Sequence, residues 1–158
     1  MWLFLFAAVI VLGVVVVQYN SIVALRQMTR NAWADVDVVL KRRAELIPNL
    51  VAAVKAYASH EQAVLEGLAE ARSRAMQLGV PGSEKAAAEG RVGERLVRVL
   101  ALAEAYPDLR ASDNFADLQK QLTDTEKLLG SARQYYNACV RDLNIKIEAF
   151  PSSLVAGA

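Results

Sequence analysis

The chain has 158 residues, of which 54% are hydrophobic and 22% are charged, and its formal net charge is +1. Without a basic excess, no electrostatic field favours a nucleic acid as partner. The single cysteine, Cys139, excludes an intrachain disulfide framework. Only 8 glycines and 4 prolines are present, and this composition favours an all-α protein over the all-β and disordered classes.

Residues 1 to 17 form an apolar segment without a charged side chain or a proline. As an α-helix this segment is about 26 Å long, which is the short end of what crosses a bilayer. Trp2 and Tyr19 lie near its two ends, where aromatic residues contact the membrane–water interfaces. We therefore predict a transmembrane anchor over residues 1–22 that crosses the membrane once.

A cleaved signal peptide is the alternative for this segment. Three observations disfavour it: no basic residue precedes the apolar run, the run is longer than that of a usual signal, and no Ala-x-Ala-like cleavage site follows. Arg26 and Arg30 follow the run before any acidic residue. The positive-inside rule then predicts an outside N-terminus and a cytoplasmic C-terminal domain.

From Ile22 onward, apolar residues recur every three or four positions, which predicts an amphipathic helix that continues directly from the membrane segment. Arg43 also falls on this apolar stripe. Pro48 interrupts it, but the apolar phase continues past the proline, so we expect a kink there rather than a turn. The breaker sequence Gly-Val-Pro-Gly at 79–82 predicts the helix end near Leu78.

A second helix is predicted over residues 84–105, with Ser83 as its N-cap. Its start, the three alanines at 86–88, favours a helix by propensity but is expected to bury little, because the apolar stripe begins later in the segment. Pro107 ends this helix, because the residue before a proline disfavours the α conformation.

The third helix begins at a cap formed by Ser112 or Asp113, and Pro151 stops it. Its apolar residues alternate between spacings of three and four, close to a heptad repeat. We therefore predict an all-α protein in which a single transmembrane helix is followed by a three-helix antiparallel bundle with a long kinked first helix. The helical domain spans 23–151, and a short, weakly ordered tail spans 152–158.

No motif in the sequence indicates catalysis. His60 is the single histidine, and neither it nor Cys139 has the neighbours of a zinc site. Residues 79–84 lack the lysine of a phosphate-binding loop, and no serine is paired with a histidine in a nucleophile motif. We expect no enzyme activity, metal, cofactor or small-molecule substrate, and we expect Cys139 to be a buried core residue.

Charged residues cluster on the first helix, where Asp35 and Asp37 precede Lys41, Arg42 and Arg43. Three interpretations remain open. These residues form a structural salt-bridge network through pairs spaced four apart, they contact another subunit, or the basic triplet binds anionic lipid headgroups. Distance disfavours the lipid interpretation, because on a straight helix Arg42 lies about 35 Å beyond the apolar run.

Aromatic residues on the first and third helices are further candidates for packing or interaction. Trp33 lies near the apolar stripe, which favours a core position over a ligand platform. Tyr135 and Tyr136 are adjacent in the sequence, so one ring points inward and the other outward. An exposed aromatic ring on an amphipathic helix is a weak indication of a partner surface.

Several motifs together resemble the LemA family of bacterial membrane proteins, and in order and spacing they cover residues 19 to about 156. They are Ala32-Trp33-Ala34-Asp35-Val36-Asp37-Val38, Leu40-Lys41-Arg42-Arg43, Leu46-Ile47-Pro48-Asn49-Leu50-Val51, Tyr106-Pro107-Asp108, Ala132-Arg133, Tyr136-Asn137 and Phe150-Pro151-Ser152. The resemblance implies one span in a bacterial inner membrane, a short outside N-terminus and a helical cytoplasmic domain without established enzymatic activity. It also implies that the helix around Pro48 is shaped by the motif residues Asp35, Asp37, Arg42, Arg43, Pro48 and Asn49.

The sequence supports two functional hypotheses, both with the lipid bilayer as a partner. The first is a membrane-anchored scaffold that self-associates as a homo-oligomer through side-by-side packing of its helices. The second is a monomeric adaptor that presents a helical surface to another membrane protein, such as a quality-control protease. Arg133 is a candidate contact for the adaptor, and Tyr136 and Asn137 are further structural or interaction candidates.

Overall fold

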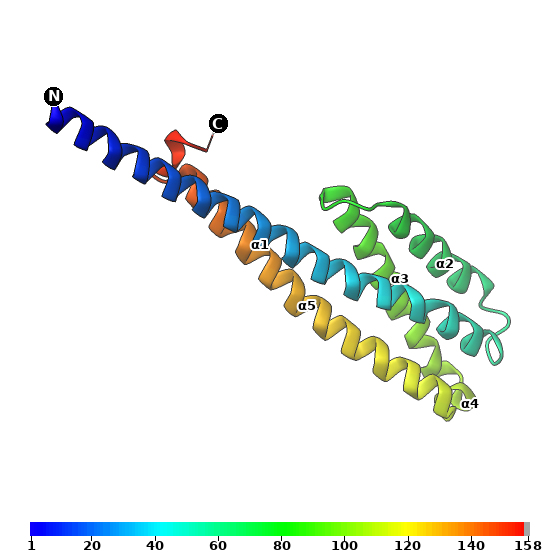
Figure 1. The fold of residues 1–158 in the computed structure, drawn as a ribbon. Helices are drawn as coiled ribbons and strands as arrows, with labels where there is room; N and C mark the ends of the chain where they lie inside the picture. Colours follow the sequence, from blue (N-terminus) through cyan, green and yellow to red (C-terminus); the bar gives the residue numbers. More distant parts are fainter. Residues whose placement is uncertain (157–158) are drawn as a thin grey trace. The chain divides into compact units, whose positions relative to one another are not determined.

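The computed structural model describes residues 1–156, and within that range it consists of helices and turns without a strand. The helices are α1 (Trp2–Lys55), α2 (Gln62–Gln77), α3 (Ser83–Ala105), α4 (Pro107–Arg110) and α5 (Asp113–Glu148), followed by the 3-10 helix η1 (Ser152–Leu154) (Figure 1). The predicted all-α class and the long apolar N-terminal helix are therefore confirmed. Residues 157 and 158 of the predicted tail lie outside the described residues.

The chain divides into two compact units, which are described separately. Unit 1 comprises Met1–Asp37 and Gly130–Ala158, and unit 2 comprises Val38–Leu129. Both α1 and α5 contribute residues to each unit.

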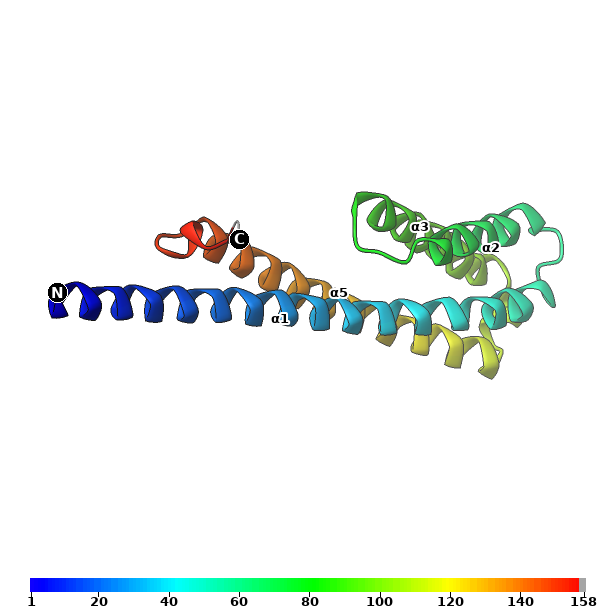
Figure 2. The same ribbon diagram turned by 45° about the horizontal axis from the view of Figure 1, so that its top comes forward.

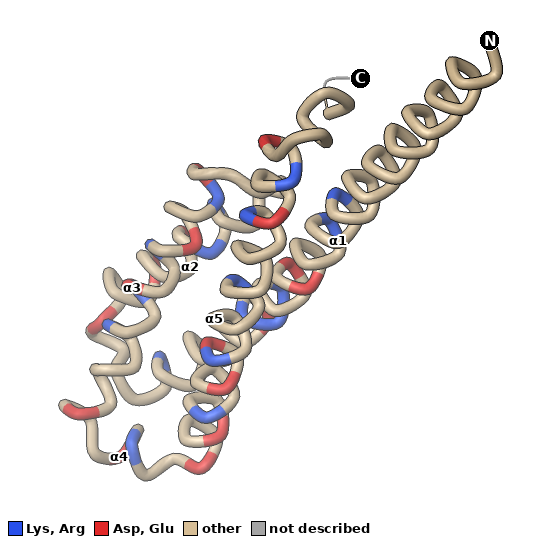
Figure 3. The backbone as a smooth tube through the Cα atoms, turned by 90° about the vertical axis from the view of Figure 1, so that its left-hand side faces the viewer, with Lys and Arg blue, Asp and Glu red and all other residues tan. Residues whose placement is uncertain are grey.

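The first part of α1 in unit 1 is apolar and unburied. Every residue from 1 to 17 is exposed, and Figure 3 shows no Lys, Arg, Asp or Glu along this stretch of the helix. By length and composition, α1 is long and apolar enough to cross a membrane. Such a surface is stable in an acyl-chain environment and unfavourable in water.

Farther along, α1 and α5 run side by side in opposite directions within unit 1 (Figure 2). Both helices contribute buried side chains to this unit, namely Ile22, Ala32, Val36 and Cys139. The expectation that Cys139 is a core residue is confirmed, because the side chain is buried and the cysteine is free.

Unit 2 has an apolar core to which all five helices contribute. Its buried members are Ile47, Leu50, Val54, Ala58, Leu65, Leu68, Ala75, Ala88, Val92, Leu96, Val99, Ala103, Leu109, Phe115, Leu118 and Leu122. Within this unit, α2 and α3 pack against each other as an antiparallel hairpin (Figure 1). Burial of these side chains is the main source of stability of the unit.

The prediction of one helix continuing to Leu78, and with it the count of three helices, is wrong. α1 ends at Lys55, and a turn over 56–61 separates it from α2. The turn is closed by the backbone N–H of Ala58, which donates to the carbonyl of Val54 at 2.8 Å, and Ala58 is 1% exposed. The local sequence has no glycine or proline, so the turn is decided by core packing, which overrides helix propensity.

The expectation that the three alanines at the start of the second predicted helix bury little is right for Ala86 and Ala87, which are exposed, and wrong for Ala88, which is buried. α3 begins at Ser83, and Lys85, Ala88 and Glu89 in its first two turns are all buried. At the start of α5, Ser112 acts as the cap, because its hydroxyl accepts the backbone N–H of Phe115 at 3.5 Å.

Candidate functional site

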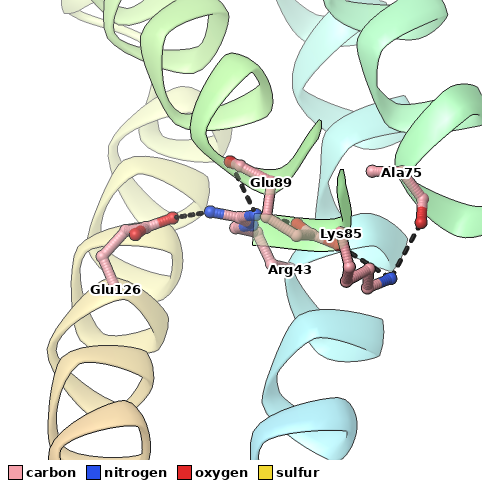
Figure 4. Close-up of polar contacts among 5 residues, drawn as sticks. All are labelled: Arg43, Ala75, Lys85, Glu89 and Glu126. Atoms are coloured by element: carbon pink, nitrogen blue, oxygen red, sulfur yellow. Dashed lines mark hydrogen bonds and ion pairs between the residues drawn. The ribbon is translucent and has the colours of Figure 1, made fainter. Parts of the chain in front are cut away.

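A buried ion-pair cluster connects three helices of unit 2, and it consists of Arg43 of α1, Lys85 and Glu89 of α3, and Glu126 of α5 (Figure 4). The guanidinium of Arg43 pairs with the carboxylate of Glu89 and, at 2.9 Å, with Oε1 of Glu126. Lys85 Nζ lies 3.0 Å from the other carboxylate oxygen of Glu89. Two cations face two carboxylates, so the cluster has no net charge.

Burial makes the pairing within this cluster necessary. The side chains of Arg43, Lys85 and Glu89 are 2%, 7% and 7% exposed, whereas that of Glu126 is 41% exposed. An unpaired charge at the buried positions would lose its hydration without compensation. The contact between Arg43 and Glu126 is partly solvated, so it contributes less to stability than the buried contact between Arg43 and Glu89. The cluster therefore restricts how α1, α3 and α5 can pack.

A fourth helix joins the ion-pair cluster through Lys85. Its Nζ donates a 2.8 Å hydrogen bond to the carbonyl oxygen of Ala75, across the turn between α2 and α3 (Figure 4). Ala75 lies in the last turn of α2, where its carbonyl also accepts the backbone N–H of Leu78 at 3.3 Å and where the helix dipole favours a cation. Lys85 thus closes the α2–α3 hairpin while it pairs with Glu89.

A second polar contact in unit 2 involves Pro48. The helix α1 continues through this proline, which has no N–H for the carbonyl of Ala44. That carbonyl instead accepts a 2.6 Å hydrogen bond from Nε of Arg72 on α2. The absence of a turn at Pro48 agrees with the sequence analysis, and the kink stays a prediction.

The structure separates the members of the predicted basic motif. Arg43 is buried in the ion-pair cluster, whereas Lys41 and Arg42 are exposed. Pro48 and Asn49 are also exposed on α1. Arg43 is therefore the member of the basic motif that joins the buried ion-pair cluster.

The remaining predicted residues lie in unit 1, where two rings meet. Trp33 of α1 packs against Tyr136 of α5, with ring centroids 5.4 Å apart and planes tilted by 60°, a favourable geometry for aromatic pairs. The neighbouring Tyr135 is 52% exposed, and a hydrogen bond with Cys139 raises the pKa of its hydroxyl.

The other predicted residues in this unit are Asp35, Arg133 and Asn137, which are exposed, and Asp37, which is half-buried.

Sequence reasoning missed four functional residues of unit 2: Arg72, Lys85, Glu89 and Glu126. Lys85 and Glu89 precede Val92 in the spacing of an apolar stripe, so an extension of the stripe towards the N-terminus would have predicted their burial. Arg72 and Glu126 carry no such signal, because their partners lie on other helices.

The chemistry of the ion-pair cluster is that of a positioning element. The guanidinium of Arg43 offers only donors, while the Glu89 carboxylate is engaged by two cations. Within residues 1–156, no three His, Cys, Asp or Glu side chains are grouped to hold a metal ion. The residues in the cluster fix helices relative to one another inside unit 2.

The sequence of this chain is similar to those of several magnetosome proteins. The chain resembles the magnetosome proteins MamQ 1 and MamQ 2 of Paramagnetospirillum magneticum, each 22% identical over 170 residues that cover 92% of this chain and 62% of the relative. It also resembles magnetosome protein MamQ of Magnetospirillum gryphiswaldense, 24% identical over 164 residues, with 88% and 60% covered. The chain thus spans about three fifths of the length of these relatives.

These relatives are magnetosome proteins by name. Together with the apolar start of α1, they indicate a membrane protein. The model of the LemA family matches residues 32–158, which is well over half of the chain. The resemblance found in the sequence is therefore confirmed, and the protein belongs to the LemA family.

Proposed function

We propose that this protein is a membrane-anchored scaffold that associates with copies of itself in a bacterial inner membrane. Residues 1–22 cross the bilayer once with the N-terminus outside, and the helical domain, residues 23–151, lies in the cytoplasm. The observation that carries the proposal is the continuity of α1, which runs without a break from Trp2 to Lys55. No flexible linker separates the apolar segment from the helical domain. Contact between the spans of two copies would therefore also bring their helical domains close together.

The surface of the span supports self-association. Apart from its chain neighbours and the backbone of its own helix, a Cβ atom added at Gly13 would meet no atom within 4 Å, and every residue from 1 to 17 is exposed within one copy. A small residue at such a position lets two membrane helices approach closely. The name of the relatives assigns those proteins to the magnetosome, and for this chain we propose only the general role of membrane organisation.

The mass of the full chain in native nanodiscs tests the proposal. We expect a discrete particle with several copies, and Gly13→Leu should reduce the copy number because the larger side chain separates the spans. Gly90→Leu is the matched control, since Gly90 lies on α3 and also has open space at its Cβ position. A wild-type protein that is monomeric in the membrane would contradict self-association.

The adaptor remains the second candidate function, and one observation favours it. Arg133 and Asn137 are both exposed and lie one turn apart on α5, so they offer a polar strip to a partner. Arg133→Glu should then remove a co-purifying membrane protein without changing the unfolding midpoint. A partner that is retained by the variant would contradict this role for Arg133.

A further inference from the structure

The C-terminal segment of unit 1 presents apolar side chains outward. Phe150 is 81% exposed and Leu154 is 75% exposed, and Ile145 in the preceding turns of α5 is 58% exposed. Residues 149–156 contain no charged side chain. Several exposed apolar side chains within one short segment mark a surface that contacts something other than water.

This segment is nevertheless folded. The hydroxyl of Ser152 is part of a buried side chain and donates to the carbonyl of Ala149 at 3.0 Å. The backbone N–H of Ser153 donates to the same carbonyl at 2.7 Å, and those of Leu154 and Val155 donate within the turn at 3.1 Å each. The expected weak order of the tail is thus replaced, in its described part, by a turn with paired donors. These bonds satisfy the N–H groups of Ser153, Leu154 and Val155, which lowers the cost of placing the turn in an apolar phase.

The position of the turn within unit 1 indicates what covers it. Because α5 runs antiparallel to α1, the end of α5 returns towards the apolar part of α1, and Figures 1 and 2 both show the red segment level with the blue half of that helix. The nearest charged residues along the chain are Glu148 and Lys146, one acidic and one basic, so the apolar character of the segment, and not a basic flank, suits contact with lipid.

We propose that residues 149–156 form a second membrane contact, in which Phe150 and Leu154 insert between the headgroups and acyl chains of the bilayer that α1 crosses. The occupant of the surface is lipid rather than a second copy, because the turn lies in the same unit as the membrane segment and level with it. The inference depends on anchoring by α1, but it does not depend on self-association.

The test uses the full chain in vesicles of phosphatidylethanolamine and phosphatidylglycerol. With Cys139→Ser as background, an environment-sensitive fluorophore is attached to Leu154→Cys or, as the matched control, to Val97→Cys, which replaces an apolar residue of unit 2 that is 66% exposed. A quencher carried on the lipid acyl chain reports lipid contact, and aqueous iodide reports contact with water. Resistance of the protein to alkaline extraction reports anchoring by α1 separately.

We expect the lipid-borne quencher to act more strongly at position 154 than at position 97, and iodide to act more strongly at 97. Phe150→Ser in the Leu154→Cys protein should lower the lipid quenching, which shows that the segment and not the fluorophore inserts. Equal quenching at both positions would overturn the proposal. Protection of position 154 from both quenchers would also overturn it, because protein would then cover the turn.

Discussion

The guanidinium Nε of Arg72 donates a 2.6 Å hydrogen bond to the backbone carbonyl oxygen of Ala44. In an uninterrupted helix this carbonyl would accept the N–H four residues later, but Pro48 occupies that position and has no N–H. A side chain of α2 thus supplies the donor that α1 lacks. The proline is tolerated inside α1 because another helix satisfies the group that it leaves open.

Arg72→Met should therefore destabilise the protein by about 1–3 kcal/mol, since it keeps much of the apolar stem and removes a charged donor. The cost should fall in a Pro48→Ala background, because the alanine N–H then bonds to Ala44 and the side chain is no longer needed. Denaturant unfolding of the four proteins in detergent gives the coupling energy. Arg74→Met on the exposed side of α2 is the control, and equal costs of Arg72→Met in both backgrounds would refute the relationship.

Arg43→Met should be one of the most damaging single substitutions in unit 2. It leaves the buried Glu89 carboxylate with Lys85 alone, and removal of one partner from a buried pair costs roughly 3–5 kcal/mol. Glu126→Gln should cost only about 0–1 kcal/mol, since the Glu126 side chain is 41% exposed.

The free energy of unfolding, measured by far-UV circular dichroism in denaturant, separates these cases. Arg42→Met changes the exposed neighbour and should stay within about 0.5 kcal/mol of wild type. Similar losses for the Arg42 and Arg43 variants would mean that burial of the ion-pair cluster does not decide its contribution.

Tyr106 should make stability depend on pH in alkaline solution. Its hydroxyl donates to Glu61 Oε1 at 3.2 Å, and partial burial, followed by this hydrogen bond and the Glu61 charge, raises the pKa of the phenol above its ordinary value of 10.0. A raised pKa in the folded state means that the protonated phenol stabilises the fold. This contribution is complete below the unfolded-state pKa and is lost as the pH rises through the folded-state pKa.

The difference in unfolding free energy between wild type and Tyr106→Phe should thus shrink as the pH is raised past 10.0. Comparison with the variant cancels the titration of other groups. Glu61→Gln should weaken the same dependence, because it removes the acceptor charge. A difference that stays constant across the alkaline range would count against this contact.

The ring contact between Trp33 and Tyr136 should appear as a coupling energy in unit 1. A double-mutant cycle with Trp33→Leu and Tyr136→Leu is expected to give about 0.5–1.5 kcal/mol in favour of the pair. Tyr135→Leu, at the exposed adjacent ring, should show no coupling to Trp33. A similar value for both tyrosines would indicate a general effect on α5 instead of a ring contact.

The proposed orientation predicts the labelling of a single cysteine in bacterial cells. In a Cys139→Ser background, Val97→Cys on α3 should not react with a membrane-impermeant maleimide in intact cells, and it should react after lysis. The side chain at this position is exposed, so reactivity reports location and not burial. Labelling in intact cells would place the helical domain outside.

Sequence periodicity predicted the helical class because the apolar spacing of each helix matches the face that it buries. Arg43 shows how far this reasoning extends: its place on the stripe between Leu40 and Ile47 indicates burial, but it does not reveal which acids pair with it. Those partners lie on α3 and α5, and local spacing within α1 contains no information about them.

The turn between α1 and α2 is a feature that the local sequence does not predict. Its residues have no glycine or proline and would also suit a continuous helix. The chain turns because α2 then buries Leu65 and Leu68 in the same core as α3, a gain in apolar burial that outweighs the lost helical hydrogen bonds. Such a decision depends on the complete unit, so no local pattern predicts it.

The bond from Lys85 to Ala75 also determines where the protein can carry foreign sequence. It holds the ends of the α2–α3 hairpin together, while Val80 in the intervening turn is 75% exposed and Gly79 has open space around it. The free energy of closing a loop rises slowly with its length. An epitope or a fluorescent protein inserted between Gly79 and Val80 should leave the hairpin intact, so the protein can be followed in living cells with α1 and the C-terminal segment unaltered.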